Sequence, residues 1–186
     1  MINEELKRIT VASLLVAISV VLGVIFKTVV PAGLNFGFPY YAIPLVIGSL
    51  ILGPLYGGMM GLISDYLGFI ILPVGEYDVI FALRAIMWGV IPWFFATYKS
   101  KWYKVLLSVF VAHVFATLSS TFSNFLYQYI LTNDFNTSIV IATGNLGLRV
   151  LMLPVNVIIM TALVHTINFR MVNIYETYLN LEDKKS

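Results

Sequence analysis

Two arginines, Arg84 and Arg149, lie inside hydrophobic stretches of the sequence. An arginine at the centre of a membrane helix costs about 2.5–3.5 kcal/mol, so such a residue usually faces a cavity or a partner of opposite charge. A guanidinium group holds a carboxylate through two parallel hydrogen bonds, which are strong where water is excluded. The two arginines therefore predict a binding site for an anionic ligand. The alternative is that one of them pairs with Asp65, which also lies in a hydrophobic stretch.

Two asparagines have the spacing to join this site. Asn145 precedes Arg149 by four residues, so the two side chains share one face of a helix. Asn124 belongs to a row of polar residues at steps of three or four: Ser120, Asn124, Tyr127 and Gln128. We expect Asn124 and Asn145 to line the same pocket as the arginines. The alternative is hydrogen bonding between helices that only holds the bundle together, which is the favoured interpretation for Ser120.

Three aromatic residues are expected near this polar cluster. Phe36 and Tyr77 fall in connections between hydrophobic stretches, and Trp88 follows Arg84 by about one helical turn. Aromatic rings are common at membrane–water interfaces, but rings beside charged groups can also stack on a flat ligand. We therefore add Phe36, Tyr77 and Trp88 to the predicted substrate-binding residues.

The sequence carries no signature of catalysis. It has no cysteine, and His113 and His165 each stand without a nearby carboxylate or second metal ligand, so we predict no catalytic residue and no metal site. A glycine-rich nucleotide loop followed by Lys-Ser or Lys-Thr is also missing. We expect a protein that is not an enzyme and binds no cofactor. Any uphill transport would then draw its energy from another subunit or from an ion gradient.

The composition indicates a membrane protein. Hydrophobic residues make up 60% of the 186 residues and charged residues 11%, against about 45–50% and about 25% in soluble proteins. These values exclude the soluble-enzyme and nucleic-acid-binding classes. Because about 20 apolar residues span a bilayer, the sequence predicts an all-α integral membrane protein, a single domain over 1–186 that forms a bundle of six transmembrane helices. The expected segments are about 9–30, 40–53, 55–72, 79–98, 103–131 and 139–169.

The distribution of basic residues predicts the orientation. Eight of the eleven basic residues flank segment ends on one face: Lys7, Arg8, Lys99, Lys101, Lys104, Arg170, Lys184 and Lys185. Basic residues concentrate on the cytoplasmic side of membrane proteins. Both termini are therefore predicted to be cytoplasmic, in a multi-pass protein of the cell (plasma) membrane. This orientation puts Arg84 and Arg149 in the outer half of the bilayer.

Small residues predict two places of close helix packing. Ser13 and Ala17 lie four apart near the inner end of the first segment, and small residues at this spacing let another helix approach closely in lipid. A second run of small residues, over 53–61, is expected to pack the second segment tightly against the third.

Several motifs resemble one family of membrane proteins. They are Phe36-Gly-Phe-Pro-Tyr-Tyr-Ala-Ile-Pro44, Gly48-Ser-Leu-Ile-Leu-Gly-Pro-Leu-Tyr-Gly-Gly58, Ser64-Asp-Tyr-Leu-Gly68, Leu72-Pro-Val-Gly75 and Leu151-Met-Leu-Pro-Val155. In this order, across most of a chain with six expected spans, they resemble the substrate-binding S components of energy-coupling factor (ECF) vitamin transporters, and within that family the folate-type branch.

The resemblance implies a small helical bundle that binds its vitamin from outside. It also implies association with a shared module of one transmembrane scaffold subunit and two ATPase subunits, which use the ATP. In the family the scaffold docks on an alanine-x-x-x-alanine surface of the first helix, and Ser13 and Ala17 occupy those positions here. Toppling of the whole S component in the membrane would then carry the pocket from the outside to the inside.

Folate fits the predicted site, since it carries two carboxylates for the arginines and a flat pterin for the aromatic rings. Three features depart from the folate-type branch: the connection Glu76-Tyr-Asp78, the pair Asn145 and Leu148 where the branch has a further basic residue, and Arg84 itself. Two alternatives stay open. One is an S component for another anionic vitamin such as pantothenate, and the other is a non-transport membrane assembly protein in which arginine and aspartate pair.

Overall fold

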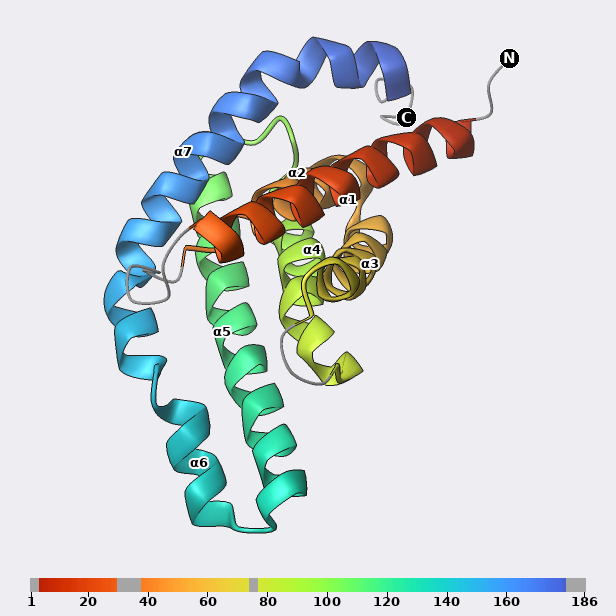
Figure 1. The fold of residues 1–186 in the computed structure, drawn as a ribbon. Helices are drawn as coiled ribbons and strands as arrows, with labels where there is room; N and C mark the ends of the chain where they lie inside the picture. Colours follow the sequence, from red (N-terminus) through yellow and green to blue (C-terminus); the bar gives the residue numbers. More distant parts are fainter. Residues whose placement is uncertain (1–3, 30–37, 74–76, 180–186) are drawn as a thin grey trace.

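The computed structural model describes residues 4–29, 38–73 and 77–179. Every regular element within these residues is helical, which confirms the all-helical fold expected from the sequence. The elements are α1 (Glu4–Val29), α2 (Ala42–Leu52), α3 (Pro54–Ile71), the short 3₁₀ helix η2 (Val79–Ala82), α4 (Leu83–Phe95), α5 (Trp102–Thr132), α6 (Phe135–Thr143) and α7 (Leu146–Leu179) (Figure 1).

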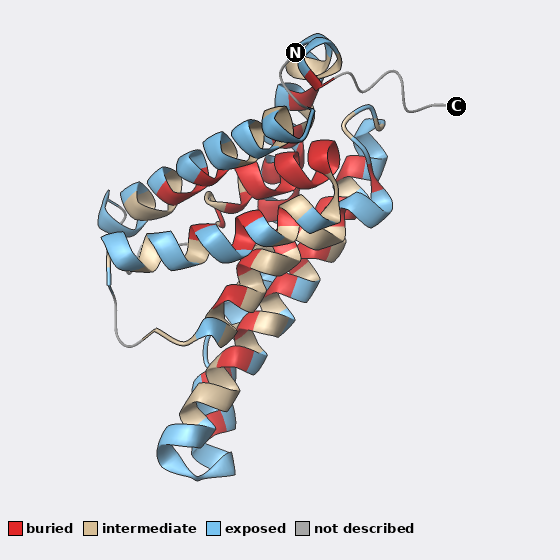
Figure 2. Cartoon of the chain, turned by 90° about the vertical axis from the view of Figure 1, so that its right-hand side faces the viewer, coloured by how far each residue is buried: buried red, intermediate tan, exposed pale blue. Residues whose placement is uncertain are grey.

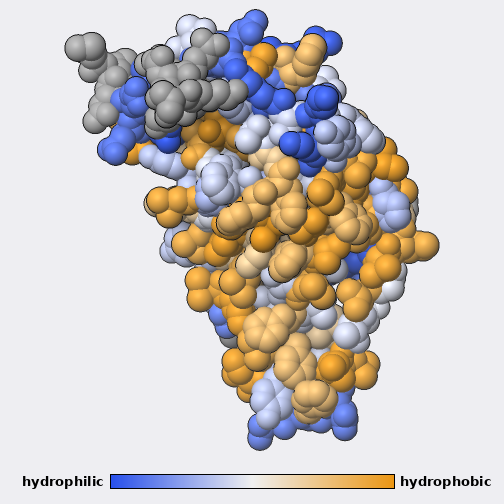
Figure 3. Space-filling view, turned by 180° about the vertical axis from the view of Figure 1, so that it is seen from behind, coloured by the Kyte–Doolittle hydropathy of each residue, from blue (hydrophilic) through white to orange (hydrophobic). Residues whose placement is uncertain are grey.

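Three helical stretches of the described chain are long and apolar enough to cross a membrane. They are Glu4–Val29, Trp102–Thr132 and Phe135–Leu179. Apolar side chains cover the middle of the molecule in Figure 3, and hydrophilic residues gather at its two ends. This distribution is the one that a bilayer requires, because the hydrocarbon cannot solvate polar groups.

The start of α1 and the end of α7 lie at the same end of the bundle (Figure 1). There the Lys7 ammonium lies 5.4 Å from the ring centroid of Tyr178, and Lys99, in the connection between α4 and α5, forms an ion pair with Glu176 of α7. The hydrogen bond that Lys99 donates to the carboxylate of Glu176 raises the pKa of Lys99 above its usual value. Two basic residues distant in the sequence, Lys7 and Lys99, therefore both contact the last part of α7 at this end.

The last expected segment, 139–169, falls on two helices, because the chain turns at Gly144 and Asn145 between α6 and α7. Asn133 ends α5 in the left-handed conformation (φ 51°), and Asp134 begins α6 by accepting hydrogen bonds from the backbone N–H groups of Asn136 and Thr137. The expected loop over 132–138 is thus a two-residue turn, and α6 packs back against α5. A capping aspartate after an asparagine explains the early helix start.

Helix α2 forms the centre of the core. It has 11 residues, all apolar but for one serine, and every residue from Pro44 to Leu52 is buried. At about 1.5 Å per residue it is shorter than a helix that spans the full hydrocarbon thickness, and α1, α3, α4 and α7 pack around it. Figure 2 shows buried residues gathered in the middle of the bundle and the α5–α6 hairpin largely exposed. Gly53 (φ 95°) and Pro54 turn the chain directly into α3, as the sequence indicated.

Helices α3 and α4 approach each other through glycines. Gly57 of α3 lies against Gly89 of α4, and Gly61 lies against the backbone of Ala85. A side-chain carbon on Gly57 or Gly89 would meet the backbone of the opposite helix. The small-residue run over 53–61 therefore packs α3 against α4, in addition to the expected contact of α3 with α2. The tight crossing fixes α4, which carries Arg84 and Trp88.

We expect Gly57→Ala to destabilise the protein by about 1–3 kcal/mol, the range for overpacking a well-filled interior. The added methyl group would force the backbones of α3 and α4 apart. Thermal unfolding of the purified protein in detergent measures the effect. Gly68→Ala is the matched control, because nothing lies within 4 Å of a side-chain carbon at that position of the same helix. Equal unfolding temperatures for the two variants would contradict the close crossing.

We also expect the start of α6 to open as the pH falls. Hydrogen bonds from the Thr137 hydroxyl and from the backbone N–H of Asn136 hold the pKa of Asp134 below its usual value. The cap is therefore fully formed above the ordinary aspartate pKa and is lost as the pH drops through the lowered one. Amide exchange over 135–143, corrected for the intrinsic rate at each pH, reports it. Asp134→Asn keeps a capping side chain that does not titrate, so the same pH dependence in that variant would refute this origin.

Candidate functional site

A cavity of about 410 Å³ lies between α1, α4, α5 and α7, at the point where the chain enters α2. Residues from five places in the sequence line it: the last turns of α1, the connection before α2, the first half of α4, the middle of α5, and the start of α7. Its volume is in the range of small-molecule binding pockets, about 300–1,000 Å³. The cavity exists only in the folded bundle, because no single helix contributes more than one wall.

Three cationic side chains line the cavity, and they come from three different helices: Lys27 of α1, Arg84 of α4 and Arg149 of α7. Arg149 donates a hydrogen bond from Nη1 to the hydroxyl of Ser120 on α5, at 3.0 Å. The Arg84 guanidinium lies over the ring of Tyr41, 5.3 Å from its centroid. The cavity is therefore rich in positive charge.

The arginines keep most of their hydrogen-bonding capacity. Among the described residues neither Arg84 nor Arg149 forms an ion pair with a carboxylate, so the alternative of a direct pair with Asp65 is not what the fold contains. A buried guanidinium without an anionic partner is costly in an apolar bundle. An anionic ligand in the cavity would remove that cost.

Buried polar atoms around the cavity lack protein partners. Arg84 Nε, Tyr41 Oη and His113 Nε2 are enclosed and form no hydrogen bond with the described residues. Each buried polar atom left unsatisfied costs about 1–3 kcal/mol, and native proteins contain few of them. A ligand in the cavity could supply partners to these three atoms.

Aromatic rings form the remaining walls. Trp88, which is 2% exposed, meets the His113 ring nearly edge-on, with centroids 5.3 Å apart. Where the chain enters α2, the rings of Phe26 and Tyr40 stack with their planes 4° apart. Flat walls of this kind favour a ligand with a flat conjugated part.

The structure brings together four of the residues singled out by the sequence analysis: Arg84, Arg149, Asn145 and Trp88 all line the cavity. Two others lie elsewhere. Tyr77 packs against α3, with its ring centroid 5.5 Å from that of Tyr66 and 5.0 Å from that of Phe69. Asn124 is half-buried on α5, about one turn beyond Ser120, and is not among the residues that line the cavity.

The other predicted site residues lie away from the cavity or beyond the described chain. Phe36 lies outside the described residues. Ser13 and Ala17, the predicted docking residues, are exposed on one side of α1, with the exposed apolar side chains of Leu14 and Ile18 beside them.

The lining residues that were not predicted include Lys27, Tyr41 and His113. A signal for Lys27 was present in the distribution of charge. It is a basic residue near the end of the first segment that is predicted to lie outside, whereas most basic residues lie on the predicted cytoplasmic face. His113 was set aside because it has no second metal ligand, although a histidine can recognise a ligand alone. Tyr41 could not be separated from the interfacial aromatic residues around it. Ser120, read as a packing residue, is the partner of Arg149.

The fold and the cavity together define a class of protein: a helical bundle with helices of membrane-spanning length around a cavity lined by cationic and aromatic side chains. Comparison with known families gives a closer identification. The model of the ECF transporter substrate-specific component matches residues 7–175, which is most of the chain. The protein therefore belongs to the family of substrate-specific components of ECF transporters. It is a transporter component rather than an enzyme.

One curated relative is the "Folate transporter FolT" of Clostridium novyi (strain NT). It is 36% identical over 100 residues, and the match spans 53% of this chain and about half of the relative, 54%. No solved structure matches the chain significantly.

Proposed function

We propose that this S component binds folate from outside the cell and delivers it to an ATP-driven uptake complex. The observation that carries the proposal is the cavity in which Lys27, Arg84 and Arg149 face aromatic rings and buried polar atoms without partners. Folate carries two carboxylates at one end and a flat pterin at the other. The similarity to a folate transporter over about half of the chain supports the same ligand.

The electrostatics of the cavity favour a dianion. Charge-assisted hydrogen bonds from guanidinium groups to carboxylates are about twice as strong as neutral ones. In the apolar interior of a membrane protein such bonds are weakly screened. Two carboxylates would pair with the cations of three helices and so join α1, α4 and α7 through the ligand. A neutral vitamin would leave these charges unpaired.

In this proposal the chain is a single membrane domain, 1–186, that crosses the plasma membrane six times, with both termini in the cytoplasm. The crossings correspond to α1, α2, α3, η2 with α4, α5, and α6 with α7. The meeting of Lys7 and Lys99 at the end where α1 begins and α7 finishes supports a cytoplasmic face there.

The energy for uptake would come from partners. The chain itself would bind no cofactor, and two ATPase subunits would use the ATP through a transmembrane scaffold subunit. Ser13 and Ala17 would form the docking surface, because their small side chains on the exposed side of α1 let a partner helix approach closely.

Ligand binding to the purified chain in detergent tests the proposal. Trp88 lies in the cavity wall, so tryptophan fluorescence should change when folate binds but not with pantothenate, riboflavin, thiamine or nicotinate. We expect Arg149→Ala to weaken folate binding roughly tenfold or more, since hydrogen bonds to charged groups contribute about 1.5–3 kcal/mol. Arg170→Ala is the matched control, because this arginine is exposed on the same helix away from the cavity.

The outcomes separate the alternatives. Tight binding of pantothenate or another vitamin in place of folate would keep the family and reject the ligand. An Arg149→Ala protein that unfolds, with no vitamin bound by the wild type, would favour a purely structural role in a membrane assembly.

We expect Ala17→Trp to abolish folate uptake by cells that contain the energising subunits while leaving folate binding unchanged. A bulky ring on this side of α1 would keep a partner helix away, but Ala17 does not line the cavity. Leu118→Trp, at a position 57% exposed on α5, is the control for a bulky lipid-facing residue. Normal uptake by the Ala17 variant would place the docking surface elsewhere.

A further inference from the structure

The cavity has two chemically different ends. Ser120, the partner of Arg149, and His113 both line it from α5, seven residues apart, which is about 10 Å along a helix. On α4, Arg84 and Trp88 are four residues apart, and the ring of Trp88 meets that of His113. Arg149 and Ser120 therefore form one end of the cavity, Arg84 lies about one helical turn from Trp88, and Trp88 and His113 form the other end.

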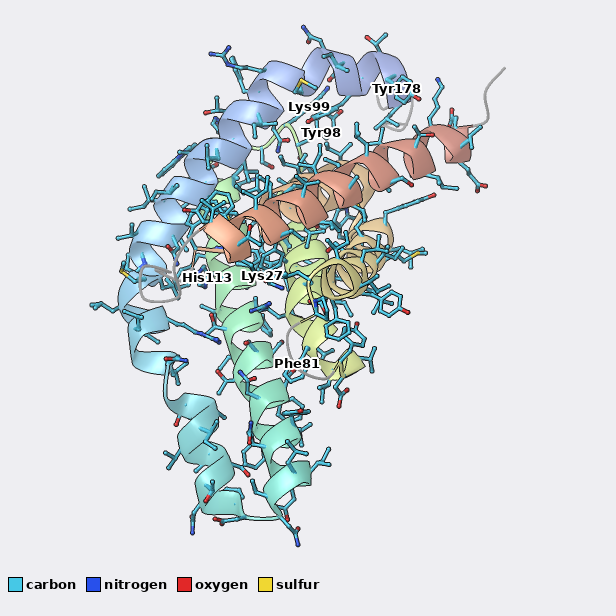
Figure 4. All side chains as sticks on the ribbon, in the orientation of Figure 1. Lys27, Phe81, Tyr98, Lys99, His113 and Tyr178 are labelled. Carbon is cyan, nitrogen blue, oxygen red and sulfur yellow. The ribbon has the colours of Figure 1, made fainter. Side chains whose placement is uncertain are left out.

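A single face of α5 connects the two ends. His113, Ala116, Thr117 and Ser120 all line the cavity and follow the helical spacing of three and four. The small side chain of Ala116, between the two polar ends, leaves room for the flat middle part of a ligand. In Figure 4 His113 and Lys27 lie near the middle of the molecule, where α1 crosses the bundle.

His113 is the polar group at the aromatic end. Its side chain is 5% exposed, and Nδ1 lies 3.3 Å from the hydroxyl of Thr117. The other ring nitrogen, Nε2, is buried and has no hydrogen-bond partner among the described residues. In the tautomer whose Nδ1–H donates to Thr117, Nε2 offers a lone pair. Contact with Trp88 and the bond to Thr117 hold the ring in place.

A hydrogen-bond acceptor at the position of His113 Nε2 could recognise an N–H group of a ligand. Lysine and arginine side chains can only donate hydrogen bonds, so the three cations themselves cannot recognise an N–H group of a ligand. A heterocycle with N–H groups at its edge, such as a pterin, needs an acceptor in the plane of its ring. A site built to hydrogen-bond a ligand group strongly rejects analogues that lack it.

We propose that His113 is a specificity-determining residue that accepts a hydrogen bond from the N–H edge of the ligand's heterocycle. The heterocycle then lies at the Trp88–His113 end of the cavity and the carboxylates at the Arg84–Arg149 end. This inference rests on folate as the ligand and adds the direction in which folate lies. It also gives a reason why carboxylated vitamins without such a heterocycle bind less well.

Truncating the ligand tests the assignment. Folate and p-aminobenzoylglutamate share the carboxylate end, but only folate carries the pterin. We expect His113→Phe, which keeps a ring against Trp88, to weaken folate binding about tenfold and to leave binding of p-aminobenzoylglutamate within about twofold. We expect Arg149→Ala to weaken binding of both compounds. Calorimetric titration of the purified protein in detergent measures all of these affinities.

Two further variants separate hydrogen bonding from packing. His113→Gln carries an amide that reaches the position of Nε2 and should recover most of the folate affinity, whereas the shorter His113→Asn should not. His165→Phe is the matched control, since this histidine of α7 does not line the cavity. The fragment also reports folding, because a collapsed cavity would lose both ligands.

Each outcome has one meaning. Unchanged folate affinity in His113→Phe, or an equal loss for folate and for the fragment, would overturn the role of His113 while leaving folate as the ligand. Failure of the Gln variant to exceed the Asn variant would also overturn it. A wild-type protein that binds no folate would overturn both this inference and the proposed ligand.

Discussion

The placing of positive charge inside an apolar bundle is the constraint on which the rest of this structure depends. Arg84 and Arg149 lie in helices that must be apolar to enter a membrane, and no carboxylate of the described chain is paired with either one. Such charges are tolerated only in a cavity that can admit an anion. The interactions that do form, from Arg149 to Ser120 and from Arg84 to the ring of Tyr41, orient the two groups without neutralising them.

The packing of the helices keeps that cavity open and fixes the positions of the side chains that line it. Helix α2 fills the centre, and the contact of Gly57 with Gly89 draws α3 and α4 together so closely that no side chain fits between them. Because α4 is fixed in this way, Arg84 and Trp88 are held facing α5. Stability and ligand recognition therefore rest on the same crossing, since a shift of α4 would move one wall of the site.

The helix that would meet the partner subunit also forms part of the cavity. Ser13 and Ala17 are exposed on α1, and Phe26 and Lys27 line the cavity about two to three turns further along the same helix. A ligand held by Lys27 and a scaffold docked near Ala17 would thus bind the same helix, the ligand near its end and the scaffold near its middle. This arrangement offers a direct mechanical connection between the two events in the proposed function.

The sequence by itself determined the protein's class: composition and run length require membrane helices, and arginines inside those helices require a cavity. It also gave four lining residues, because charge in an apolar stretch and a spacing of four residues are local signals. Only the tertiary structure decided which helices meet. It separated Tyr77 and Asn124 from the cavity, added Lys27, Tyr41 and His113, and divided the last segment at the turn between α6 and α7. The physical reason is that side chains distant in the sequence form the cavity. Whether they meet depends on close helix crossings such as that of Gly57 and Gly89, and local sequence patterns do not specify these crossings.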